Sequence, residues 1–197
     1  MKSIVIFILI FGFLATIAFA QSEYVEYGQN SVGGAVSFGT YNKTTSGYEF
    51  SLGMSSNGTT DINASYLYIK HRQSHAEVKS VTLSHLLLKE GRWGVPFSFG
   101  LGVGYTMTGL DNYPSALVAL FKKIRINDGT YLQPSVIGAY LDPMGDEQKR
   151  LGQWEIGVSL FFSSPKQVYF IKPAVVVGKG DDFIGISVGF LYKTHHR

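Results

Sequence analysis

The sequence predicts an all-β protein, a closed, antiparallel, up-and-down transmembrane β-barrel of about ten strands. Three observations support this expectation. Apolar residues alternate with small or polar ones over long stretches, short polar turns separate the stretches, and charged residues are scarce. Only 16% of the 197 residues are charged, whereas ordinary soluble domains contain roughly 25%. Few charges suit strands whose outer surface faces lipid rather than water.

The alternation is clearest between Pro96 and Met107. Large apolar residues occupy every second position from Phe97 to Met107, and no residue between them is larger than threonine. Side chains alternate across a strand, so one face of this segment is apolar and the other is nearly bare. Turned inward, ten such apolar faces would overfill a barrel and leave an outer surface with too little charge for water. We therefore expect the apolar face to point outward to lipid and the small residues to line the lumen.

Ten strand-like stretches follow the first twenty residues. Their predicted ranges are 32–41, 46–55, 61–70, 76–88, 94–107, 115–126, 130–141, 152–163, 168–178 and 183–192. Most have about the ten residues that a tilted strand needs to cross a bilayer. The fourth stretch is the least regular, and its loss would leave eight strands as the alternative. Asn57-Gly58 and Asp128-Gly129 are typical of hairpin turns because these residues tolerate positive φ.

The N-terminus has the layout of a secretory signal peptide. Residues 1–20 combine an early lysine, a long apolar run and the ending Ala18-Phe-Ala20, which predicts cleavage before Gln21. An uncleaved membrane anchor is the alternative. After this segment we expect a short lead-in at 21–31, an outer-membrane barrel at 32–193 and a C-terminal tail at 194–197. The absence of cysteine excludes a lipid-anchored lipoprotein and a disulfide scaffold.

An even number of strands allows both ends of the barrel to lie on one side of the membrane. With that side in the periplasm, the predicted periplasmic turns are 56–60, 89–93, 127–129 and 163–167. The predicted external loops are 42–45, 71–75, 108–114, 142–150 and 179–182. The longest of them, 142–150, is external, as longer loops of such barrels usually are.

The last strand carries the most specific resemblance to a known class. The segment Gly185–Tyr192 is similar to the glycine-and-spaced-aromatics signal for barrel assembly, although Val188 stands at a usually aromatic position and residues 193–197 extend past it. With the alternation along the chain, this segment resembles the small OmpA-like and porin-like outer-membrane barrels of bacteria. The resemblance implies a bacterial outer-membrane location, contact with outer-membrane lipid, and recognition of the C-terminal strand by the barrel-assembly machinery. We expect a monomer.

A set of charged residues is predicted to face the lumen. Its members are Glu49, Lys123, Arg125, Glu155 and Lys172. Charges inside a narrow barrel must pair or be hydrated, because unpaired burial is costly. We favour an ion-pair network that plugs the lumen, and the alternative is a polar lining that selects solutes.

The predicted function is non-enzymatic, a structural or surface-interaction role that leaves small-solute passage open. One alternative is a secreted, soluble, lipocalin-like barrel for an apolar ligand, suggested by Gly91-Arg-Trp93. A second is a barrel hydrolase using His75 or His85, although the adjacent serines face the opposite side of the strand. We predict no catalytic site and no cofactor site. We also predict no metal site, because His195-His196 has no partner ligands at useful spacing. No basic cluster is dense enough to indicate nucleic-acid binding.

Overall fold

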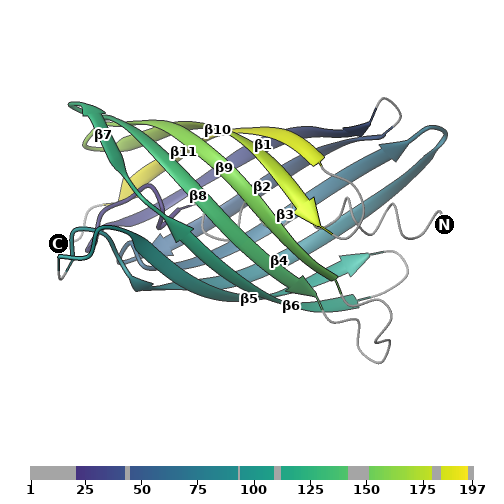
Figure 1. Ribbon diagram of the computed structural model, residues 1–197, viewed down its shortest axis with the longest axis horizontal. Coiled ribbons are helices and arrows are strands. Elements are labelled where there is room, and N and C mark those ends of the chain that lie inside the picture. Colours follow the sequence, from purple (N-terminus) through teal and green to yellow (C-terminus); the bar gives the residue numbers. More distant parts are fainter. Residues whose placement is uncertain are drawn as a thin grey trace.

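The molecule is a closed antiparallel β-barrel, shown in Figure 1 by a computed structural model. The structure describes residues 21–42, 45–92, 94–108, 112–141, 151–178 and 183–194. The predicted signal peptide, Trp93, residues 195–197 and parts of the predicted external loops lie outside these ranges. Over the ranges described, no helix has the length and apolar character that crossing a membrane requires.

Eleven strands build ten positions in the wall. They are β1 (Asn30–Asn42), β2 (Thr45–Ser56), β3 (Thr60–His71), β4 (Ser74–Leu88), β5 (Ser98–Thr108), β6 (Asn112–Phe121), β7 (Ile124–Asn127), β8 (Thr130–Leu141), β9 (Leu151–Ser163), β10 (Gln167–Gly178) and β11 (Phe183–Thr194). β6 and β7 share one position, because both pair with β8. The barrel closes where β1 pairs with β11, from Asn30↔Thr194 to Thr40↔Ile184. The prediction of ten strands is confirmed, and the alternative of eight is wrong.

Most strand boundaries differ from the predicted ones by one to three residues, and two larger differences have a local cause. The fifth strand begins at Ser98 rather than at 94, because residues before it form a turn with Gly91 and Gly94 at positive φ (80° and 73°). The sixth stretch is interrupted at Lys122 and Lys123, where the main-chain N–H of Lys123 donates to Glu90 Oε2 at 2.6 Å. The Glu90 side chain, from the turn between β4 and β5, thus binds the Lys123 amide in place of a ladder partner, and the strand is divided into β6 and β7.

The connections fall at two opposite ends of the barrel. At one end, here called the turn end, the strands join through the short segments after β2, β4, β7 and β9. The first residue of β1 and the last residue of β11 also lie at this end. The predicted hairpin at Asn57-Gly58 is confirmed, with φ of 57° and 62°. At the opposite loop end lie the connections after β1, β3, β5, β8 and β10. The connections are grouped at the two ends as predicted from the sequence, and the assignment of the turn end to the periplasm stays a prediction.

The alternation of side chains follows the predicted orientation. Val103 and Leu52 point outward and are 60% and 73% exposed, whereas the inward Ser98 and Thr106 are buried. The same pattern holds along β2, β9 and β11. A soluble lipocalin-like barrel needs the reverse arrangement, so this alternative is not supported by the structure.

The lumen is more apolar than the small residues of the sequence indicated. An inward cluster gathers side chains from β4, β6 and β8: Leu86, Tyr113, Leu117, Ala119, Phe121, Ile137, Ala139 and Leu141. A second contains Phe161, Val168, Phe170 and Leu191 from β9, β10 and β11 together with two residues that precede β1. Apart from Lys172, β10 carries mainly apolar residues on both faces, which explains why period-two alternation did not reveal the apolar part of its inner row.

Candidate functional site in the lumen

The first described residues lie inside the barrel at the turn end. Gln21–Val25, here called the N-terminal segment, are each at most 2% exposed. The N–H groups of Tyr24 and Val25 donate to the carbonyl oxygen of Gln21 at 3.1 and 3.3 Å, which forms a compact turn. The sequence indicated only a short lead-in here, so the placement of this segment in the lumen is a new structural feature.

The segment is hydrogen-bonded to one wall through Asp61 and Lys89. The Asp61 carboxylate, on β3, accepts the Ser22 N–H at 2.9 and 3.0 Å and the Ser22 hydroxyl at 2.8 Å. Lys89, just after β4, donates through Nζ to the carbonyl oxygens of Ser22 (2.7 Å), Val25 (2.6 Å) and Gly58 (2.6 Å). These three bonds use all three donors of an ammonium group. Burial, together with the nearby charge of Lys123, lowers the pKa of Lys89 to about 7 against the opposing charges of Asp61 and Glu26.

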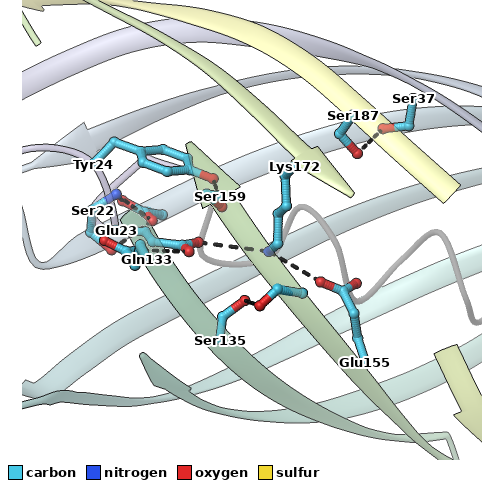
Figure 2. Close-up of polar contacts among 12 residues, drawn as sticks. Ser22, Glu23, Tyr24, Ser37, Gln133, Ser135, Glu155, Ser159, Lys172 and Ser187 are labelled. Carbon is cyan, nitrogen blue, oxygen red and sulfur yellow. Dashed lines mark hydrogen bonds and ion pairs between the residues drawn. The ribbon is translucent and has the colours of Figure 1, made fainter. Parts of the chain in front are cut away.

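Tyr24 and Glu23 reach the opposite wall. The Tyr24 hydroxyl lies 2.7 Å from Ser159 Oγ on β9, and its ring stacks on Phe170 of β10 with centroids 4.5 Å apart. Gln133 of β8 donates through Nε2 to Glu23 Oε1 at 2.5 Å. Figure 2 shows Tyr24 beside Ser159 and Glu23 beside Gln133 inside the barrel. The N-terminal segment therefore bridges the lumen from β3 to β8, β9 and β10.

A charged centre lies next to this bridge. Lys172 Nζ, on β10, is 3.1 Å from Glu155 Oε1 of β9 and 3.9 Å from Glu23 Oε2 of the N-terminal segment (Figure 2). The side chains of all three are at most 2% exposed. Because an unpaired buried charge is strongly destabilising, the lysine holds the two carboxylates and with them the segment. Glu49, on β2, is also fully buried.

The five charged residues predicted from the sequence occupy two regions. Glu49, Glu155 and Lys172 lie in the lumen, and the structure brings the last two together. Lys123 is half-buried at the turn end, with Nζ 5.4 Å from the centre of the Tyr131 ring. Arg125 is not in the lumen: its side chain is 64% exposed and pairs with Asp128. The break after β6 places Arg125 on the β7–β8 hairpin, which projects at the turn end on the left of Figure 1.

The N-terminal segment was missed because it has no strand periodicity. Two features of the sequence could have indicated a segment inside the barrel. Asp61 is a carboxylate in an inward row of β3, and Lys89 directly follows a long strand. Each needs a partner inside the barrel, because buried charges are paired or hydrogen-bonded.

The candidate hydrolase histidines lie on the outer face. His85 is exposed, and its Nδ1 is 2.8 Å from Thr60 Oγ1 on the neighbouring strand. The ring of His75, also exposed, stacks on Tyr68 with centroids 5.7 Å apart. His195 and His196 lie outside the described residues. Among the side chains that the structure places, no group of three or more His, Cys, Asp or Glu residues is arranged to hold a metal ion.

Comparison with solved structures identifies the class of fold. No protein-family model and no curated protein matches the sequence. The translocator domain of autotransporter NalP from Neisseria meningitidis superimposes with a TM-score of 0.55 and 10% identity, over 93% of this chain and 94% of that one. The fold is that of an outer-membrane β-barrel. An outer-membrane channel from Pseudomonas putida F1, COG4313, superimposes on this barrel with a TM-score of 0.51 and 8% identity, over 88% of this chain and 98% of that one. At such identities the likeness describes the fold alone.

Proposed function

We propose that this protein is an integral outer-membrane barrel of a bacterium with a structural or surface-interaction role and no enzymatic activity. Residues 1–20 act as its export signal, and the connections at the loop end face outside the cell. The barrel is held closed at the turn end by its own N-terminal segment. The outward apolar rows and the outer-membrane barrel fold of the structural neighbours support the membrane assignment.

The observation that carries the structural role is the two-walled attachment of the N-terminal segment. Asp61 and Lys89 hold it on one side, and Tyr24 holds it on the other through Ser159 and Phe170. A wide, permanently open pore would instead keep its polar lining in water. A barrel bridged in this way acts as a rigid support for the connections at the loop end.

The route for a small solute ends at this bridge. A recess of about 490 Å³ opens at the turn end, and its lining includes Glu23 and Gln133, the pair that joins the N-terminal segment to β8. Solutes pass only when the segment moves. We therefore expect brief, rare openings rather than a steady current.

Planar-bilayer recording tests this assignment. The wild-type protein should show a closed baseline with infrequent events. The double variant Tyr24→Ala and Lys89→Met, which removes one anchor on each wall, should open far more often. Tyr192→Ala is the matched control, because it removes an outward-facing tyrosine from β11 and should leave the baseline unchanged. A steady, large conductance of the wild-type protein would refute the closed barrel.

The membrane assignment has a separate test. The protein should fractionate with membranes, require detergent, and migrate differently on gels with and without boiling, because a closed barrel resists unfolding by detergent. A monodisperse protein in plain buffer would contradict it. Failure of this test would leave the two-walled attachment of the segment unaffected.

A further inference from the structure

A hollow of about 400 Å³ lies on the outer wall across β5, β6, β8 and β9. Two rows of outward-facing residues form most of its lining. The first crosses four strands in register as Leu101, Val118, Gly138 and Trp154. The second, one step closer to the loop end, contains Ala116, Tyr140 and Gly152. Both rows point away from the lumen, because the residues between them, such as Leu117 and Ala139, are buried inside.

The shape of the hollow comes from small residues in unusual places. Glycines such as Gly102 and Gly104 face the lumen, where a Cβ would come within 3.0 Å or less of Ser84 or Ser115. No such crowding explains Gly152, because a Cβ added there would meet no atom within 4 Å. The hollow is therefore deep at Gly152 although packing in the lumen does not require a glycine there.

Large side chains form the rim. Leu101, Tyr140 and Trp154 are 46%, 44% and 55% exposed and surround the small residues. The Trp154 ring leans over Gly138, where an added Cβ would lie 2.8 Å from a ring carbon. The tryptophan thus forms a side wall instead of projecting freely.

Water is a poor occupant of this hollow. Its lining is almost entirely apolar, and the wall behind it is backed by the inward cluster around Leu117, Ile137 and Ala139. The lining has only two polar side chains, Tyr140 at the rim and Gln153, which is buried in the inward row, whereas a bound water needs two to four polar partners. An empty hollow would leave the lining atoms without van der Waals partners.

We propose that the hollow is a binding site for one acyl chain of a membrane lipid. This inference rests on the proposed membrane location. The outward rows face hydrocarbon, so an acyl chain reaches the hollow without desolvating any polar group. A second copy of this chain fits less well, because a two-fold interface needs a self-complementary surface and two concave hollows do not fill one another.

Trp154 supplies the reporter. The chain has only two tryptophans, so Trp93→Phe leaves Trp154 as the single tryptophan, which is excited selectively at the red edge of its absorption. The full-length barrel in detergent micelles is titrated with a phospholipid that carries brominated acyl chains, which quench tryptophan on contact. We expect quenching to saturate at a low lipid fraction, as for a site rather than for bulk exchange.

Filling the hollow should remove the site. Gly152→Leu places a side chain in open space, and Ala116→Leu is the second variant if the first folds poorly. Each should shift the titration several-fold to higher lipid fractions and lower the amount of phospholipid that co-purifies with the barrel. Ala64→Leu is the matched control, an exposed outward alanine on β3, and it should change neither quantity.

Two outcomes would overturn the proposal. An unchanged titration in both filled variants, with unchanged co-purified lipid, would mean ordinary exchange of surrounding lipid. A wild-type dimer that Gly152→Leu converts to a monomer would assign the hollow to a second copy of the chain. The gel shift on boiling distinguishes both results from failure of the membrane assignment itself, because every variant should still show it.

Discussion

Replacing Lys172 with methionine removes the ammonium that lies between Glu155 and Glu23 but keeps most of the side-chain volume. The ion pair has an N···O distance of 3.1 Å, and the side chains of Lys172 and Glu155 are 2% and 0% exposed. Breaking a buried pair by removing one partner costs roughly 3–5 kcal/mol, because the other charge stays behind. Two carboxylates are left here, so we expect Lys172→Met to lower the free energy of unfolding by an amount at the upper end of that range.

A double-mutant cycle measures this interaction. Urea unfolding of the barrel in lipid vesicles, followed by tryptophan fluorescence, gives the free energy of unfolding of the wild type, Lys172→Met, Glu155→Gln and the double variant. Glu155→Gln should cost less than Lys172→Met, because Lys172 keeps Glu23 at 3.9 Å. The double variant should cost clearly less than the sum, since neighbouring residues couple by about 0.5–3 kcal/mol.

The control for this cycle is Lys166→Met, which removes an exposed lysine from the turn after β9. Its effect should stay within about 0.5 kcal/mol, as for ordinary surface substitutions. A cost below about 1 kcal/mol for Lys172→Met, or strict additivity of the two single substitutions, would refute a paired charged centre in the lumen.

Three further predictions follow from the wall and the turn end. Val103→Arg, on the outward row of β5, should cost about 2–4 kcal/mol in vesicle unfolding if the position is near the bilayer midplane; no measurable cost would mean that this face meets water. Between pH 7 and 10.5, Lys89 is more protonated when the N-terminal segment is undocked than when it is docked, because docking buries Lys89 and lowers its pKa to about 7. Rising pH should therefore favour docking. Bilayer openings should become rarer over this range in the wild type but not in Lys89→Met, and more frequent openings at high pH would contradict the docking arrangement. Gly58→Ala should destabilise more than Gly91→Ala: both have positive φ, but only at Gly58 does a Cβ collide with a main-chain oxygen, that of Glu26. Equal losses in urea unfolding would show that the turn at Gly58 is not tightly packed.

The wall was predictable because lipid imposes a two-sided pattern on each strand. Leu101 and Val103 face hydrocarbon while the glycines between them face the interior, and this difference is visible in the sequence alone. Strand ends were harder to predict. The sequence pattern continues through Lys122, and only the contact between the Lys123 amide and Glu90, more than thirty positions apart, reveals the break.

The candidate site was less predictable than the wall because it depends on contacts between distant parts of the chain. The inward positions of Glu155 and Lys172 follow from alternation, but their pairing depends on the register of β9 against β10. Tyr24 and Ser159 are 135 positions apart and meet only when the barrel is closed. Arg125 was misplaced for a related reason, because an unbroken strand was assumed where the chain changes course.

The join between β1 and β11 has a consequence for how the molecule is made. The partners Asn30 and Thr194 lie near opposite ends of the described chain, so two unsatisfied strand edges persist until the last twelve-residue strand is delivered. Such edges invite mispairing with other chains, and contacts of this sequence separation form slowly. A nascent polypeptide of this design must be shielded during synthesis and export, and removal of its final strand should yield an aggregating intermediate rather than a slightly smaller cylinder.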